Sequence, residues 1–137
     1  MVWSLTGAEL LRRPVRVRGI ELGRPVDLLL HPHEPHVLGL DVLCGDERHR
    51  FLPVFAADVR RDHVEAASPL VLLDLRDDSF YRRRARSLSD LRGAQLDGSG
   101  ELEDVVLGPT WRIVELVLEG GRRIPLDGLV LPGRRDR

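Results

Sequence analysis

Short apolar runs, separated by residues that favour turns, recur along most of the chain. Runs of Val and Leu a few residues long, bounded by Gly, Pro or Asp, are typical of β-strands. Strands are therefore predicted at 14–18, 26–30, 37–43, 70–75, 94–96, 103–107 and 113–119, and two more begin at FLPV (51–54) and RIPL (123–126). Pro is tolerated at the start or the edge of a strand. The pattern indicates a mainly β protein.

Two segments have the start signals of short helices. In Ser4–Leu11, Thr6 can act as the N-cap and Glu9 follows three residues later, which is the pattern of a capping box. In RDDSFYRRRARSLSDL (76–91), the leading Asp-Asp-Ser places hydrogen-bond acceptors and negative charge where a helix would begin. A short helix is therefore expected in each segment.

The chain contains an internal repeat. GRPVDLLLHP, which starts at Gly23, matches GELEDVVLGP, which starts at Gly100, with Gly, Asp and Pro identical at an offset of 77 residues. Three further blocks match in the same order: 10–15 with 90–95, 36–43 with 112–119, and 51–59 with 123–131. Because several matches in one consistent order rarely arise by chance, we infer two copies of one β unit.

The second copy is shorter than the first. It has no counterpart of segment 70–75, and the missing strand would leave a sheet edge to be covered by the first copy or by a second chain. Its hairpin loop contains Gly120-Gly121, which suits a two-residue turn with positive φ, whereas the first copy has four more residues around Cys44–Arg50. The predicted organisation is a first repeat (1–76), a linker with a short helix (77–90), a truncated second repeat (91–133) and a disordered tail (134–137).

The repeated pattern is G-x-x-x-D followed by apolar residues and Pro, then an alternating apolar strand and a strand that contains Pro. It resembles the PRC-barrel family over residues 4–76 and 87–133. The resemblance implies an all-β fold of small barrels, formed as two barrels, as one and a partial one, or as one shared by both repeats. Such modules occur in the cytoplasmic part of the photosynthetic reaction centre H subunit and in a bacterial ribosome maturation factor. The resemblance also implies a non-catalytic module that docks or assembles proteins.

The composition of the chain limits the classes of function and the cellular location that we expect. With 21 basic and 22 acidic residues the formal net charge is −1, without the basic excess usual in a general nucleic-acid binder. Cys44 is alone, which excludes an internal disulfide and suits a reducing cytoplasm. No apolar run approaches the roughly 20 residues of a membrane span, and the start of the sequence lacks the pattern of a signal peptide. We therefore expect a cytoplasmic protein that does not insert into a membrane.

The densest cluster of potential metal ligands is HPHEPH (31–36), with three His and one Glu. In the internal alignment this segment is the turn between two strands. Pro32 and Pro35 hold it extended, which spreads the imidazole rings apart, whereas a zinc site needs converging donors. We therefore interpret HPHEPH as a turn and expect no metal and no cofactor.

Asp27 and Asp104 occupy equivalent positions of the two copies. A carboxylate just inside a strand is expected to accept a hydrogen bond from a nearby backbone N–H or to pair with an Arg. The sequence contains no G-x-S-x-G motif, and Cys44 has no basic residue closer in sequence than Arg48. We therefore predict no catalytic residues and no enzyme.

A candidate interaction surface lies in the linker, in SFYRRRARS (79–87). The residues assigned to it, with one aromatic from a turn of the second copy, are Phe80, Tyr81, Arg82, Arg83, Arg84 and Trp111. Aromatic rings beside Arg can stack bases and pair phosphates. The alternatives are that the linker aromatics pack onto a barrel while the Arg side chains face solvent, or that the segment docks a protein. The Trp is either a surface anchor or a cover for the core.

The function predicted from the sequence is a non-enzymatic cytoplasmic module for protein docking or assembly. We expect it to form a homodimer through its unfinished sheet edge, and the sequence does not identify any other protein partner. A ribosome- or RNA-associated assembly factor is one alternative, based on the resemblance and on the Arg-rich linker. A small-ligand or metal sensor, based on HPHEPH and Cys44, is the other.

Overall fold

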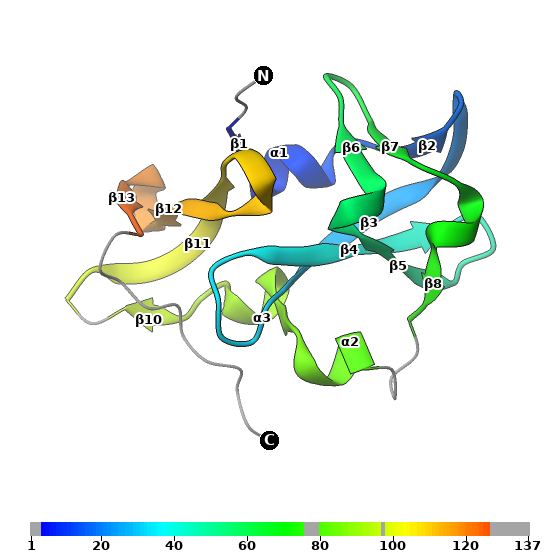
Figure 1. Cartoon of the computed structure of the whole chain (residues 1–137). Helices are drawn as coiled ribbons and strands as arrows, with labels where there is room; N and C mark the ends of the chain where they lie inside the picture. The colour runs from blue at the N-terminus through cyan, green and yellow to red at the C-terminus, as the bar shows by residue number, and fades with distance from the viewer. Residues whose placement is uncertain (1–3, 76–79, 97, 127–137) are drawn as a thin grey trace.

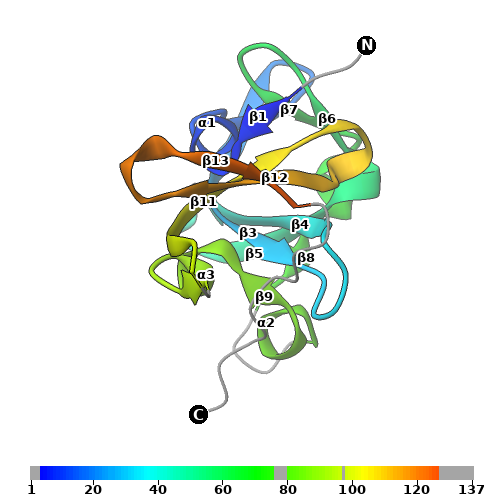
Figure 2. The ribbon, with the colours of Figure 1, turned by 90° about the vertical axis from the view of Figure 1, so that its left-hand side faces the viewer.

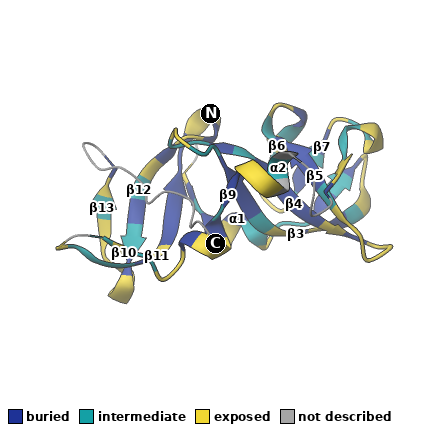
Figure 3. Cartoon of the chain, turned by 90° about the horizontal axis from the view of Figure 1, so that it is seen from below, coloured by how far each residue is buried: buried dark blue, intermediate teal, exposed yellow. Residues whose placement is uncertain are grey.

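The computed structural model describes residues 4–75, 80–96 and 98–126. Most of them lie in strands, which form two curled sheets joined side by side (Figures 1 and 3). The prediction of an all-β, barrel-like fold with a short linking helix is confirmed.

The larger sheet contains most of the first repeat. Its eight strands are β2 (Val15–Val17), β3 (Ile20–Leu30), β4 (Val37–Cys44), β5 (His49–Pro53), β6 (Ala57–Val59), β7 (Val64–Ala66), β8 (Leu73–Asp74) and β9 (Arg86–Ser87). They run in the order β6-β7-β2-β3-β4-β5-β8, and β9 pairs with β3 beyond the end of β2. β7 pairs with β2 in parallel, which brings residues 57–66 back against the first hairpin.

The smaller sheet contains most of the second repeat. Its five strands are β1 (Leu5–Thr6), β10 (Gln95–Leu96), β11 (Gly100–Leu107), β12 (Ile113–Leu118) and β13 (Arg123–Pro125). They run in the order β1-β11-β12-β13, and β10 also pairs with β11. Counterparts of β6, β7 and β8 are absent from the described residues of this repeat, so its sheet stays more open than the first.

Short helices connect the strands. They are α1 (Gly7–Leu11), α2 (Phe80–Arg84) and α3 (Leu88–Leu91). The predicted capping box of α1 is present, because Thr6 Oγ1 accepts a bond of 3.1 Å from the Glu9 N–H and Glu9 Oε1 accepts one of 3.0 Å from the Thr6 N–H. The helix expected in the linker is shorter than predicted, since β9 separates α2 from α3. The three residues proposed as its N-cap (77–79) lie outside the described residues.

Segment 70–75 is a turn rather than the full strand that its apolar residues predicted. Pro69 opens a 3-10 turn, η2 (Pro69–Val71), and Ser68 Oγ accepts a bond of 3.1 Å from the Leu70 N–H. Pro fixes φ and a preceding Ser caps such a turn, so local chemistry overrides the apolar pattern. Only the two residues of β8 pair with β5, and Leu70 is left 89% exposed.

β9 and α3, which begin in the predicted linker (77–90), are counted here as the first strand and helix of the second repeat. The sheets do not coincide with the repeats, because each repeat places its first strand and helix on the other's sheet. β1, at the start of the first repeat, pairs with the end of β11, and β9, at the start of the second repeat, pairs with the end of β3 (Figure 2). The paired residues are Leu5 with Leu107, Thr6 with Val106, Arg86 with Leu30, and Ser87 with Leu29. Since 30 and 29 align with 107 and 106 at the repeat offset of 77, the exchange is reciprocal and gives the chain an approximate two-fold symmetry.

The two sheets meet where this symmetry requires. His36 and Arg112, which are equivalent positions of the two copies, form an isolated antiparallel bridge. Beside it, the Ile113 N–H donates a bond of 2.8 Å to the Pro35 carbonyl oxygen. The pseudo-two-fold axis therefore passes through the junction between the two strand–strand turns.

A continuous apolar core runs through both halves (Figure 3). Its fully buried members include Leu28, Leu30, Leu40, Leu102, Leu107 and Leu116. The exchanged helices contact each other within it, because a Cβ atom on Gly7 of α1 would lie 2.6 Å from Leu88 of α3. A second, smaller cluster (Leu29, Phe51, Leu75 and Ala85) lies on the opposite face of the larger sheet, under α2.

The β4–β5 and β12–β13 hairpins have loops of equal length. The Cys44 N–H donates to Arg48 O at 2.9 Å and the Leu118 N–H donates to Arg122 O at 2.7 Å, so three residues form each loop. The glycine pair at 120–121 has the predicted positive φ, although the loop is one residue longer than the predicted turn. The four extra residues of the first copy lengthen its two strands equally, which keeps each side chain on its proper face.

Candidate docking surface

HPHEPH forms the turn between β3 and β4, as predicted. The imidazole rings are not spread apart as expected, because the His31 ring centroid lies 4.9 Å from that of His36 and 6.1 Å from that of His33. His31 Nδ1 accepts hydrogen bonds from the His33 N–H (3.0 Å) and the Glu34 N–H (2.9 Å), so this ring nitrogen holds the turn. The Arg86 guanidinium donates to the carbonyl oxygens of His31 (2.8 Å) and Glu34 (3.1 Å). In the part of the chain that the structure describes, no three His, Cys, Asp or Glu side chains are placed to hold a metal ion.

The aromatic part of the linker packs on the sheet. Tyr81 of α2 stacks on the buried ring of Phe51, with the ring centroids 3.9 Å apart and the planes 13° from parallel. On the other side of Phe51 lies Gly39, where a Cβ atom would be 2.5 Å from the ring. Phe51 is thus held between a backbone and a second ring, and one face of the Tyr81 ring is occupied by this stack.

The Arg residues of the linker have different environments. Arg83 and Arg84 are exposed on α2, whereas Arg86 is 3% exposed and burial lowers the pKa of its guanidinium. The side chains of Phe80 and Arg82 lie outside the described residues. The sequence alone did not show that Arg86 is buried while Arg83 and Arg84 are exposed. A two-residue strand is too short to give a recognisable alternation of buried and exposed positions.

Trp111 is a core residue. It is 8% exposed, at the end of η3 (Pro109–Trp111), and packs in the main apolar cluster. Thr110 and Trp111 both have left-handed backbone, with φ of 63° and 62°. This conformation is costly for residues other than glycine, and here it turns the indole into the core.

Asp27 and Asp104 act as reciprocal helix caps. Asp104 Oδ2 accepts a bond of 3.0 Å from the Ala8 N–H in the first turn of α1, and Asp27 accepts from the Ser89 N–H (3.1 Å) and hydroxyl (2.5 Å) in the first turn of α3. The expected bond to a nearby backbone N–H is confirmed, because Asp27 Oδ1 accepts from the Leu28 N–H (2.8 Å) and Asp104 Oδ1 from the Val105 N–H (2.7 Å). The additional donors, on the helices, were not predicted. Burial raises the pKa of Asp27, and the bonds from Ser89 oppose that rise.

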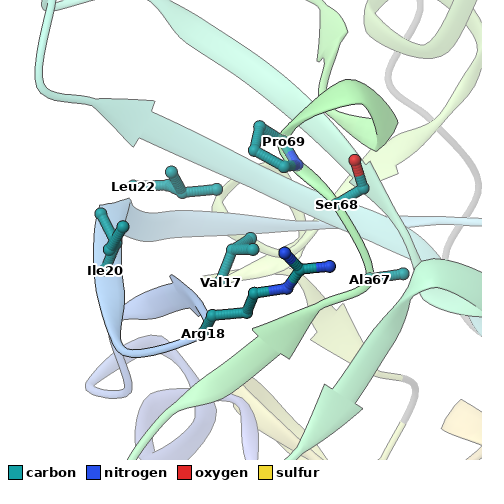
Figure 4. Close-up of a pocket in the computed structure, with 7 residues that line it drawn as sticks. All are labelled: Val17, Arg18, Ile20, Leu22, Ala67, Ser68 and Pro69. Carbon is teal, nitrogen blue, oxygen red and sulfur yellow. The ribbon is translucent and has the colours of Figure 1, made fainter.

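Exposed apolar side chains of the first repeat lie near one another where the β2–β3 hairpin meets η2. Ile20, near the tip of the β2–β3 hairpin, is 68% exposed, and Leu70 of η2 is 89% exposed. Between them lies a hollow of about 330 Å³ lined by Val17, Arg18, Ile20, Leu22, Ala67, Ser68 and Pro69 (Figure 4). A second hollow of about 280 Å³ shares Leu22 and Pro69 with the first. We call Ile20, Leu22, Pro69 and Leu70 the hairpin-tip surface.

This surface occurs where the two-fold symmetry is broken. Residues 54–75, which carry Leu70 and the 88% exposed Phe55, form η1 (Val54–Ala56), β6, β7, η2 and β8. The described part of the second repeat has no such segment, and its one large exposed apolar side chain is Val114, at 41%. Sequence reasoning missed the surface because it placed Leu70 in a strand, although the Ser68-Pro69 pair was a visible turn signal.

β13, the last strand of the smaller sheet among the described residues, is less suited to pairing than its sequence suggested. Across the β12–β13 hairpin, the Leu118 N–H donates to the Arg122 carbonyl oxygen and the Leu126 N–H to that of Val114. Because backbone groups along a strand point alternately to its two sides, those of Arg123 and Pro125 point away from β12. Pro125 has no N–H, so this stretch of the edge offers a single donor. Proline at an edge is a device against strand addition.

Comparison with known proteins adds no assignment. No protein-family model matches the chain, and no curated protein matches it. Among the described residues, no helix has the length and apolar character needed to cross a membrane.

Proposed function

We propose that this protein is a non-enzymatic docking and assembly module that binds protein through the hairpin-tip surface. The observation that carries the proposal is the exposure of Ile20 and Leu70 beside the hollow of about 330 Å³, which the β2–β3 hairpin forms with residues 67–69 of the segment that has no described counterpart. Single exposed apolar residues are common, but a contiguous set beside hollows is typical of an interface. Burying both side chains would contribute roughly 3 to 6 kcal/mol to association.

The PRC-barrel resemblance supports the same function, and we propose membership of that family on the repeated pattern. Four polar side chains from the segments that the sequence singled out have structural roles: Asp27 and Asp104 cap helices, and Arg86 and His31 hold a turn. These roles support a module without catalysis or a cofactor. Cys44 is a buried free thiol, which fits the cytoplasm as the proposed location.

RNA binding is the second candidate, favoured by the exposure of Arg83 and Arg84 on α2. It is weaker, because base recognition in single strands needs free aromatic faces and Tyr81 is stacked on Phe51. Two Arg side chains alone would give only salt-sensitive contact with phosphates.

The test is affinity capture from the native lysate with the wild type, the double variant Ile20→Ser with Leu70→Ser, and the control Val114→Ser. Each sample is divided, with and without RNase, and captured proteins are quantified by mass spectrometry. We expect proteins that survive RNase, are captured by the wild type and the control, and are lost from the double variant.

If the double variant captured the same proteins as the wild type, the proposal that this surface binds them would be contradicted. Capture that is lost with RNase, and with Arg83→Glu and Arg84→Glu, would favour the RNA alternative instead.

A further inference from the structure

We propose that the occupant of the hairpin-tip surface is a second copy of this chain, an inference that rests on the docking function proposed above. In the dimer, two β2–β3 hairpin tips pack about a two-fold axis. Ile20 of each chain enters the hollow of the other, and Arg18 of each chain faces Glu21 of the other.

The shape of the surface supports a self-complementary contact. An isologous interface uses one patch twice, so the patch must contain both a projection and the depression that receives it. Ile20, 68% exposed, projects from the hairpin, and the hollow of about 330 Å³ lies directly beside it, between Leu22 and Pro69 (Figure 4). Leu70, 89% exposed next to Pro69, extends the apolar area that a second copy would cover.

The charges of the hairpin tip are also self-complementary. Arg18 and Glu21 are both exposed, and within the described residues neither side chain has a hydrogen-bond or ion-pair partner. The Arg18 guanidinium extends along the hollow (Figure 4). Arg16, which stands opposite Glu21 in the hairpin, already faces Asp62 at 3.9 Å. A tip with one free cation and one free anion can form two equivalent pairs with its copy, whereas a tip of one sign would repel it.

The hairpin backbone holds these side chains in place. Arg18 and Gly19 have φ of 50° and 82°, and Glu65 Oε2 accepts a bond of 2.9 Å from the Arg18 N–H. The tip is therefore anchored to β7 before any partner arrives. Because little ordering is needed on association, a small apolar contact can be effective.

The experiment is sedimentation equilibrium of the purified full chain, from micromolar to near-millimolar concentration. We expect a monomer–dimer equilibrium for the wild type and for the control Val114→Ser. The double variant Ile20→Ser with Leu70→Ser should remain monomeric, and circular dichroism verifies that it is folded.

A wild type that stays monomeric throughout would overturn the second copy as occupant. If lysate proteins were still captured through the same residues, the docking function would stand without it. If the double variant dimerised as strongly as the wild type, the interface would lie elsewhere and the inference would be overturned.

Charge reversal tests the orientation of the two chains. Arg18→Glu and Glu21→Arg should each weaken self-association by about tenfold, because each creates two like-charged contacts in the dimer. Mixing the two variants should restore association, since each tip then meets the opposite sign. Equal behaviour of the single variants and their mixture would overturn the Arg18–Glu21 contact.

Discussion

Gly39 permits the aromatic stack that closes the second face of the larger sheet, so Gly39→Ala should be strongly destabilising. A Cβ atom at this position would lie 2.5 Å from Phe51 Cε1 and Cζ and would also contact the Leu52 carbonyl oxygen. Ordinary van der Waals contact begins near 3.4 Å, so the overlap is about 1 Å. The Leu52 carbonyl belongs to β5 and cannot move without breaking strand pairing.

The phenyl ring is no freer to move than the backbone. Tyr81 lies against its far face at 3.9 Å, so a ring displaced from residue 39 must push Tyr81 off the sheet. Overpacking costs about 1 to 3 kcal/mol, and a lost aromatic stack adds about 0.5 to 1.5 kcal/mol. We therefore expect Gly39→Ala to lower the free energy of unfolding by roughly 2 to 4 kcal/mol.

The measurement is urea denaturation followed by circular dichroism, with Gly45→Ala as the matched control. A Cβ atom on Gly45 would meet nothing within 4 Å and its φ is not positive, so the control should be neutral or slightly stabilising. The midpoint of Gly39→Ala should fall by roughly 1 to 2 M relative to the control. A shift smaller than that of ordinary surface variants, about 0.5 kcal/mol, would show that the ring is not confined as described.

Two further predictions concern pH and the links between repeats. Burial raises the pKa of Asp27, so the folded state holds its proton more tightly, and stability should fall as pH rises from about 4 through the folded pKa. Asp27→Asn should remove that dependence, and urea midpoints measured across this range would show parallel curves if the reasoning were wrong. Bonds to Asp62 and Glu65 raise the pKa of His63, so its stabilisation is complete below the unfolded pKa and is lost as pH rises through the folded one. His63→Gln should flatten this second change, and an NMR titration of the ring that shows an unshifted pKa would contradict it. Asp104→Ala should cost about 1 to 3 kcal/mol by leaving the Ala8 N–H unpaired, and an unchanged melting temperature would refute the cap.

Local sequence signals predicted the elements well, because they act within a few residues. Thr6 and Glu9 lie in one helical turn, so their spacing alone specified the capping box. Period-two alternation located β4 and β12 to within one or two residues. Leu70 was misassigned because an apolar residue after Pro is equally compatible with a strand and with a turn.

Long-range relations were only half visible. The identity of Asp27 and Asp104 at one offset indicated a shared role, and the structure shows that role as capping. The additional donor from the other repeat could not be predicted, because a two-residue strand such as β1 carries too little pattern to identify its partner. The hairpin-tip surface was hidden for a similar reason, since it forms from segments that β7 brings together.

The reciprocal exchange constrains the order in which the protein can mature on the ribosome. The Ala8 N–H is synthesised 96 residues before its acceptor on Asp104. β1 and α1 must therefore wait, without their sheet, until β11 has been made, while the body of the first repeat has its own neighbours much sooner. Contacts of such sequence separation close slowly. A nascent chain stalled before β11 would carry β1 unpaired, with Leu5 uncovered, so each repeat becomes complete only when the other has been made.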